Sequence, residues 1–127
     1  MRFSSFHKSG RGRGKEIGFP TLNLQIPDEF VLEIGVYAAI VRIGNSEYMG
    51  AMHYGPVPVF DEAENSLEIY LLNIDDTNFP DTANKKIEVE VKKYIREIRT
   101  FPDPKSLAEQ IKNDVDQIQS YLASIKK

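Results

Sequence analysis

Apolar side chains in the middle of the chain follow the patterns expected of β-strands. Residues 35–43, GVYAAIVRI, are rich in β-branched and aromatic types, and residues 48–54, YMGAMHY, continue in the same way. Gly44 and Asn45 lie between these two runs, and both residue types tolerate the positive φ of a tight turn. This arrangement predicts a β-hairpin.

Two more strands are predicted further along the chain. Residues 67–74, LEIYLLNI, form an apolar run, and residues 86–95, KIEVEVKKYI, begin with a strict alternation of aliphatic and charged side chains. The alternation indicates one buried face and one face in water. Pro56 and Pro58 cannot donate to a sheet ladder, so we expect them to end the second arm of the hairpin.

The pattern changes to a helical period at the C-terminus. Asp103 and Pro104 form a good N-cap and first-turn pair. Apolar side chains then recur every three or four residues, at Leu107, Ile111, Val115, Ile118, Leu122 and Ile125. Several antiparallel strands followed by one amphipathic helix predict a mainly β fold. We expect a small barrel or sandwich over 1–102, with the helix of 103–127 packed on its outside.

Length and composition narrow the class of protein to which this chain can belong. A chain of 127 residues is expected to be one domain, 1–127, and 41% hydrophobic with 28% charged residues is ordinary for a globular protein. No apolar run reaches the roughly 18 residues of a membrane span, and the first residues lack the apolar region of a secretory signal. We therefore expect a cytoplasmic protein with no membrane partner. The absence of cysteine excludes disulfides, thiolate metal sites and a thiol nucleophile.

Positive charge is concentrated near the N-terminus. The net charge of −3 argues against whole-surface attraction to nucleic acid, yet Lys8, Arg11, Arg13 and Lys15 follow one another closely, with glycines between the last three. Backbone N–H groups of a glycine-rich turn can bind an anion, and flanking cations can bind phosphate oxygens. A mobile basic leader is the alternative. The stretch matches neither the Walker loop nor the dinucleotide fingerprint.

The next residues, GFPTLN at 18–23, are poorly suited to a linker, which would leave Phe19 and Leu22 in water. Thr21 and Asn23 are two apart in an extended segment after proline, so their side chains are expected on the same face. A hydroxyl and an amide oxygen suit Mg²⁺ held jointly with nucleotide phosphates. The alternative for such a pair is ordinary hydrogen bonding in a turn.

These motifs together resemble the signature of the riboflavin kinase (flavokinase) family. Residues 10–23, G-x-x-R-G-K-x-I-G-F-P-T-L-N, are similar to that family's glycine-rich basic loop followed by G-F-P-T-A-N. The resemblance covers nearly the whole chain. Further matches follow in order at Gly35 to Ala38, Tyr48 and Gly50, Gly55, Pro58 and Phe60, 67–72, Ile95, Arg96 and Phe101, and from Leu107 to Asp114.

The resemblance implies a six-stranded antiparallel Greek-key barrel with a C-terminal helix. It implies an enzyme that transfers the γ-phosphoryl group of ATP to the terminal ribityl hydroxyl of riboflavin, giving FMN, with Mg²⁺ as cofactor. By this similarity Thr21 and Asn23 would hold the metal and Glu68 would accept the hydroxyl proton, while Arg96 and Phe101 would bind the flavin. The implied nucleotide-binding residues are Gly10, Arg13, Gly14, Lys15, Gly18, Pro20 and Thr21.

The residues themselves leave alternatives for these roles. Glu68 and Tyr70 share one face of the predicted strand, where a carboxylate could face a barrel mouth and act as a base. The alternative is a surface glutamate. Arg96 could equally be a surface arginine paired with Glu97 or Asp103. The candidates for stacking on a flavin ring, with burial in the core as the alternative, are Phe19, Tyr37, Tyr54, Phe60 and Phe101.

The chain departs from the family pattern in three places. Residues 53–60, HYGPVPVF, stand where the family usually has Asn-Ile-Gly-x-x-Pro-Thr-Phe, so an amide and a threonine are missing from the presumed substrate side. Residues 75–86, DDTNFPDTANKK, replace a turn that usually contains glycine, and Asn84 is the expected substitute because asparagine tolerates positive φ. Leu22 replaces the alanine of P-T-A-N.

Two other classes of protein stay open. A non-catalytic flavin- or nucleotide-binding barrel of the same origin would fit the changes at 53–60. A nucleic-acid-binding small barrel would use the Arg/Gly stretch and strand aromatics, but the acidic net charge argues against it. We expect small-molecule substrates, no nucleic-acid partner and a monomer.

Overall fold

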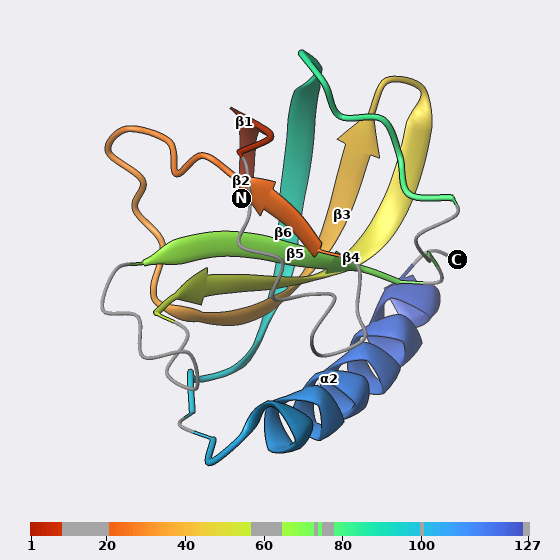
Figure 1. Ribbon diagram of the computed structural model, residues 1–127. Helices are drawn as coiled ribbons and strands as arrows, with labels where there is room; N and C mark the ends of the chain where they lie inside the picture. Colours follow the sequence, from red (N-terminus) through yellow and green to blue (C-terminus); the bar gives the residue numbers. More distant parts are fainter. Residues whose placement is uncertain (9–20, 57–64, 73, 75–77, 100, 126–127) are drawn as a thin grey trace.

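The computed structural model describes residues 1–8, 21–56, 65–72, 74, 78–99 and 101–125 (Figure 1). In this part of the chain six strands precede one long helix. The elements are β1 (Arg2–Phe6), β2 (Thr21–Leu24), β3 (Gly35–Ile43), β4 (Ser46–Gly55), β5 (Ser66–Leu71), β6 (Lys86–Arg96) and α2 (Pro104–Ile125).

All six strands form one antiparallel sheet in the order β1-β6-β3-β4-β5-β2. The sheet curls until its two edge strands meet. His7 and Leu24 form an isolated bridge there, and the Lys8 N–H donates to the Asn23 carbonyl at 2.8 Å. The expected six-stranded barrel with a C-terminal helix is therefore confirmed.

Two apolar cores lie on opposite faces of this sheet. The inner core contains every second residue of the strands, as the alternation predicts, and includes Leu22, Leu24, Val41, Met52, Leu67, Ile69, Ile87 and Val89. Tyr37 and Tyr54 are also buried in it, so the core alternative was right for these two aromatics. Phe19 and Phe60 lie outside the described residues.

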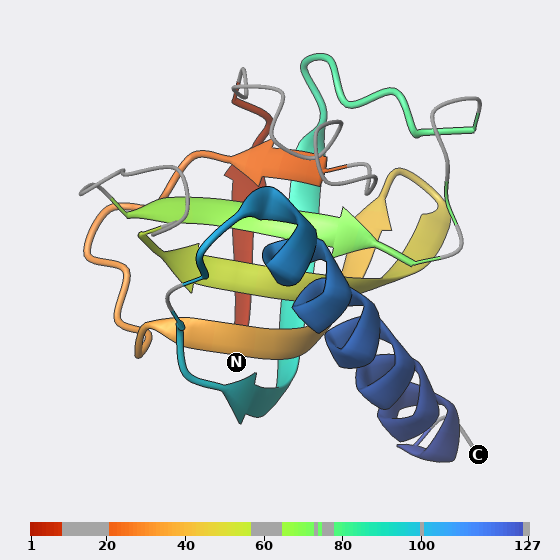
Figure 2. The ribbon, with the colours of Figure 1, turned by 60° about the horizontal axis from the view of Figure 1, so that its bottom comes forward.

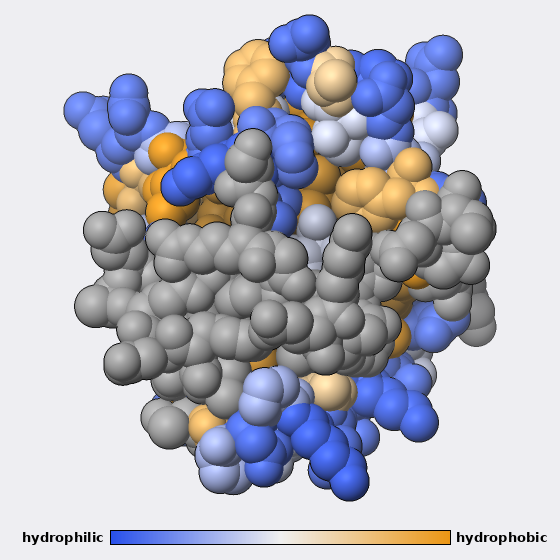
Figure 3. All heavy atoms as spheres, in the orientation of Figure 1, coloured by the Kyte–Doolittle hydropathy of each residue, from blue (hydrophilic) through white to orange (hydrophobic). Residues whose placement is uncertain are grey.

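The outer core lies between the sheet and α2, which crosses the outer face over β4 and β5 (Figure 2). Residues from β3, β4 and β5 face the helix, among them Ala38, Ala51 and Tyr70. Where α2 lies, in the lower right of Figure 3, the outward-facing side chains are mainly hydrophilic. The helix thus buries one stripe and exposes the other, as its period indicates.

The N-cap of α2 is formed as the sequence predicts. The backbone N–H of Ser106 donates to a carboxylate oxygen of Asp103 at 2.7 Å. This hydrogen bond, made to the charged form, holds the pKa of Asp103 below its ordinary value. The cap supplies a partner for one of the otherwise unpaired N–H groups of the first turn.

The buried stripe of α2 differs from the predicted stripe at two positions. Leu107, Ile111, Ile118 and Leu122 are buried as expected. Ile125, however, is 43% exposed, because the end of the helix extends beyond the strands. Val115 is only partly buried, and its neighbour Asp114 takes the buried place in the stripe.

Most strand boundaries agree with the sequence, with two exceptions. β5 ends at Leu71 instead of residue 74, because Leu72 is already in a turn. β1 was not predicted at all. Gly44 adopts the positive φ expected of the hairpin turn, and Asn84 has a φ of 58°, which confirms its expected role as a substitute for glycine. Among the described residues, no helix is long and apolar enough to span a membrane.

Candidate active site

Strand register aligns five side-chain positions across the outer face of the sheet. Asn23 pairs with Glu68, Glu68 with His53, His53 with Val36, and Val36 with Arg96. We call these five residues the outer row. Directly opposite residues of antiparallel strands point to the same face, with Cβ atoms about 4.5–5.5 Å apart. Glu68 therefore has Asn23 on one side and His53 on the other.

A second line of residues runs parallel to the outer row, two positions along each strand. Thr21 pairs with Tyr70, and Tyr70 pairs with Ala51. Since alternate residues of a strand share a face, Thr21 and Asn23 both lie on the outer face beside Glu68. The expectation that these two side chains share a face is confirmed, because Leu22 between them is fully buried in the inner core.

Glu68 is buried on this face and is only 2% exposed. The alternative of a surface glutamate is therefore wrong. The side chain also does not face the barrel interior, where its neighbours Leu67 and Ile69 pack in the inner core. Glu68 instead lies on the helix side of the sheet with Tyr70, whose side chain belongs to the outer core. A carboxylate buried here is held in a fixed position beside oxygen-bearing side chains of β2.

The segment that carries the predicted nucleotide residues begins and ends at this place. The hydrogen bond from Lys8 to Asn23 fixes its start, and β2 begins at Thr21. Six of the predicted residues lie outside the described part of the chain: Gly10, Arg13, Gly14, Lys15, Gly18 and Pro20. The described residues on either side of them are Lys8, which is bonded to Asn23, and Thr21, the first residue of β2.

A narrow pocket, with a volume of about 20 Å³, lies between the outer row and the first half of α2. We call this space the pocket. Its walls are mostly apolar, with polar groups at both ends. The residues that line it are Val36, Ala51, His53, Tyr70, Arg96, Ile98, Arg99, Phe101, Leu107, Ile111 and Asp114. His53 and Tyr70, next to Glu68 in register and in sequence, thus border the same pocket as Arg96 and Phe101.

Arg96 is held in the wall of the pocket by a buried ion pair. Its Nε donates to both carboxylate oxygens of Asp114, at 2.9 and 3.0 Å, and its Nη2 donates to Oδ2 at 2.8 Å. The two side chains are 9% and 3% exposed. Nη1 donates to the Glu97 carbonyl at 2.9 Å, and the guanidinium carbon lies 5.9 Å from the centre of the Phe101 ring. The surface-arginine alternative is wrong, and the ionic partner is Asp114.

Gln110, one turn before Asp114 on α2, supports this ion pair. Gln110 donates from Nε2 to the Asp114 carboxylate at 3.1 Å, and Arg99 donates to the side-chain oxygen of Gln110 at 3.4 Å. The carboxylate of Asp114 therefore has partners on both oxygens, as a buried charge requires. This arrangement links the end of β6 to the helix.

The structure brings together Thr21, Asn23 and Glu68, and it places Arg96 and Phe101 in a pocket that starts beside Glu68. Sequence analysis put position 53 on the presumed substrate side but gave His53 no role, and it did not identify Asp114 as the partner of Arg96. A signal for Asp114 was present, since a charged residue in an apolar helical stripe is unusual unless it is paired. The place of His53 opposite Glu68 follows only from the register of β4 and β5, which its local sequence does not reveal.

The donor chemistry at Thr21 and Asn23 fits a magnesium ion. Within the described residues, no group of three or more His, Cys, Asp or Glu side chains could hold a metal. A hydroxyl and an amide oxygen on the same face are hard ligands, too few for a closed metal cage. Such a partial set suits Mg²⁺, which usually keeps waters and shares substrate phosphates.

Comparison with known proteins identifies the class. The family model described as riboflavin kinase (Flavokinase) matches residues 1–122. The chain therefore belongs to the riboflavin kinase family, which is a family of enzymes.

Individual relatives agree with this assignment. The chain is 32% identical over 115 residues to the bifunctional riboflavin kinase/FMN adenylyltransferase of Buchnera aphidicola subsp. Acyrthosiphon pisum, covering 88% of this chain and 36% of that protein. It is 34% identical over 107 residues to the RNA-binding riboflavin kinase RibR of Bacillus subtilis, covering 84% of this chain and 44% of that protein. The chain thus spans well under half the length of these relatives.

A solved structure has the same fold. The crystal structure of a macrolide-efflux protein from Streptococcus pneumoniae superposes with a TM-score of 0.77 at 25% identity. The match covers 93% of this chain and 38% of that chain.

Proposed function

We propose that this chain transfers the γ-phosphoryl group of MgATP to the terminal ribityl hydroxyl of riboflavin, forming FMN and ADP. Besides family membership, one observation of the structure supports this proposal. Glu68 is buried on the outer face, opposite Asn23 on one side and opposite His53 on the other, and His53 lines the pocket together with Arg96 and Phe101. A flavin- or nucleotide-binding module without catalysis would not need a carboxylate in this position.

Glu68 acts as the base in this proposal. Its carboxylate accepts the proton of the ribityl hydroxyl as the hydroxyl oxygen attacks the γ-phosphorus. The bond from that phosphorus to the β,γ-bridging oxygen breaks, and ADP leaves with the bond's electron pair. General base catalysis of this kind is typically worth about 10²- to 10⁴-fold in rate. Most of the remaining acceleration in phosphoryl transfer comes from positioning and charge neutralisation.

Thr21 and Asn23 supply oxygen ligands for Mg²⁺ next to Glu68, and the bound ion neutralises phosphate charge. The glycine-rich segment, with Gly10, Gly14 and Lys15, covers the nucleotide phosphates. Support for this assignment comes from the residues on either side of that segment, since Lys8 is bonded to Asn23 of β2 and Thr21 begins β2, the strand next to the one that carries Glu68.

In this proposal the pocket widens to take the flavin ring, with the ribityl chain directed toward Glu68. Phe101 and the aliphatic walls offer apolar surface to the ring, and Arg96 offers hydrogen-bond donors. Asp114 balances the charge of Arg96, so this pair presents no net charge to the neutral ring of riboflavin. The protein is proposed to work as a monomer in the cytoplasm.

The test is to incubate the purified protein with riboflavin, ATP and Mg²⁺ and to separate the flavins by chromatography. We expect FMN only when all three are present, with none after chelation of the metal. A parallel fluorescence titration measures riboflavin binding alone. Riboflavin binding without FMN would support a non-catalytic barrel, and the absence of both would contradict the proposed function.

Nucleic-acid binding has less support from the described residues. On the outer face the cations Arg2, Arg42 and Lys92 all contact Glu90, so they do not form a free basic surface. The name of one relative states that it binds RNA. Filter binding of structured RNA at low and moderate salt tests this function, and retention that falls steeply with salt would support it.

A further inference from the structure

His53 is the residue of the outer row whose chemistry the proposed function leaves unassigned. It lies on β4 directly opposite Glu68 of β5, on the same face of the sheet. Directly opposite residues have Cβ atoms about 4.5–5.5 Å apart, a spacing at which histidine and glutamate side chains can meet. His53 also lines the pocket, while Glu68 is 2% exposed beside it.

The remaining charged and titratable groups around the pocket narrow what His53 can interact with. Those that line the pocket with His53, in addition to Glu68 next to it, are Tyr70 of β5, Arg96 of β6, Arg99 of the following segment and Asp114 of α2. Arg96 and Asp114 are engaged with each other in the bidentate pair. Val36, the neighbour of His53 on its other side, is apolar. Glu68 is therefore the carboxylate placed to interact with His53.

We propose that His53 is a positioning residue that holds the carboxylate of Glu68 from the adjacent strand and makes turnover depend on its own protonation. The catalytic part of this inference rests on the proposed function. The neutral imidazole donates one N–H to the carboxylate and fixes its orientation. The protonated imidazole adds a full positive charge, which favours the ionised carboxylate and so weakens it as a proton acceptor.

A histidine in this place would give the contact with Glu68 a response to pH. Histidine ordinarily changes charge near pH 6.5, whereas an amide side chain can hold a carboxylate but does not titrate.

The pairing can be tested without any turnover. The chain has two histidines, so a His7→Gln background leaves one imidazole signal for an NMR titration. We expect Glu68→Gln to lower the titration midpoint of His53 by about one pH unit, because a nearby carboxylate favours the protonated form. Glu90→Gln removes a carboxylate from another part of the same face and should leave the midpoint unchanged. An equal midpoint with and without Glu68 would overturn the inference.

The catalytic consequence needs a second measurement. The ratio of wild-type to His53→Asn turnover should fall at least about threefold between pH 8 and pH 6, because only the wild type carries the titrating group. Taking the ratio cancels the ionisation of ATP itself. His53→Ala, which lacks any donor, should lose turnover at pH 8, whereas His53→Asn should retain most of it. A pH-independent ratio would contradict the effect on turnover.

The two proposals fail separately. If the protein forms no FMN but the midpoint of His53 still depends on Glu68, the proposed function is wrong and the pairing stands. If FMN is formed while the midpoint does not respond to Glu68→Gln, the positioning role of His53 is wrong and the kinase stands.

Discussion

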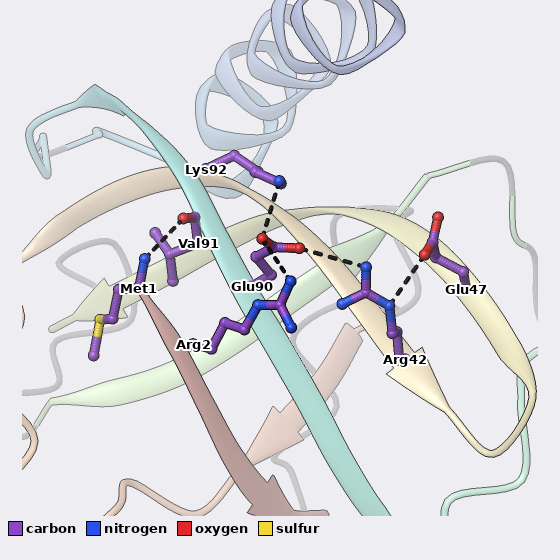
Figure 4. Close-up of polar contacts among 7 residues, drawn as sticks. All are labelled: Met1, Arg2, Arg42, Glu47, Glu90, Val91 and Lys92. Carbon is purple, nitrogen blue, oxygen red and sulfur yellow. Dashed lines mark hydrogen bonds and ion pairs between the residues drawn. The ribbon is translucent and has the colours of Figure 1, made fainter. Parts of the chain in front are cut away.

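The outer face of the sheet carries charged side chains in two regions with opposite surroundings. Under the first half of α2, Arg96 and Asp114 form a bidentate pair with 9% and 3% of their side chains exposed. In the other region Glu90 contacts Arg2, Arg42 and Lys92 at 3.0–3.4 Å, and Arg42 also contacts Glu47 (Figure 4). We call this second group the Glu90 cluster. Its side chains are 15–73% exposed.

The comparison of the two regions shows that burial, more than the number of contacts, decides how much a charged pair affects the stability of the fold. Breaking a buried pair leaves an uncompensated charge away from water and costs about 3–5 kcal/mol, whereas exposed pairs contribute about 0–1 kcal/mol each. The Glu90 cluster has more contacts but less effect on stability. The Glu90 cluster lies beside the start of β1, where the Val91 N–H of β6 donates to the carbonyl of Met1, the residue before β1, at 2.7 Å.

The largest expected effect is that of Asp114→Ala. Removing the carboxylate strands the Arg96 guanidinium in the pocket wall, so the free energy of unfolding should fall by about 3–5 kcal/mol. Urea unfolding at neutral pH measures the change. Asp116→Ala, on the exposed side of the same helix, is the matched control and should change stability by less than about 0.5 kcal/mol. Equal losses of stability in Asp114→Ala and Asp116→Ala would contradict the claim that the buried pair matters more for stability than exposed charges.

A smaller effect is expected at Thr21, one of the two ligands of the proposed magnesium site. Thr21→Ala should raise the Mg²⁺ concentration needed for half-maximal turnover about five- to tenfold, equivalent to about 1–1.4 kcal/mol of lost metal binding. Thr21→Ser keeps the hydroxyl and serves as the control. Magnesium titrations of turnover at saturating riboflavin make the measurement. An unchanged metal requirement in Thr21→Ala would show that Thr21 is only a structural residue.

The smallest effect is expected in the Glu90 cluster. The hydrogen bond from Lys92, and the charge of Arg2, hold the pKa of Glu90 below its ordinary value. A lowered pKa in the folded state stabilises the protein above the unfolded pKa of about 4.3, and that stabilisation is lost as pH falls through the folded value. Glu90→Gln should therefore cost no more than about 1 kcal/mol at pH 7, and less as the pH falls through the folded-state pKa of Glu90. A cost that grew toward acid pH would contradict this assignment.

Local signals in the sequence predicted much of the fold. The hairpin, the alternation in β6 and the N-cap at Asp103 depend on residues close in sequence, and the structure agrees with all three. β1 could not be predicted, because RFSSF has no clear period and is a strand through its pairing with β6, more than 80 residues away. Strand formation of this kind depends on context more than on propensity.

The candidate site was predictable to a lesser degree. The resemblance suggested Thr21, Asn23 and Glu68, but only the register of β2 and β5 puts Asn23 and Glu68 opposite each other. The partner of Arg96 was missed because Glu97 and Asp103, which are nearer in sequence, were considered in place of Asp114, 18 residues away on the helix. A strand residue that points toward a packed helix finds its partner there, and sequence distance does not show it.

The most direct test of the account is a comparison of the wild type with Glu68→Gln. This change keeps the approximate shape of the buried side chain and removes its negative charge and its capacity to accept a proton. Turnover of riboflavin to FMN should fall at least about tenfold, while the Kd values for riboflavin and MgADP, from fluorescence titration and calorimetry, stay within about twofold. Equal turnover in the two proteins would contradict the assignment of Glu68 as the base.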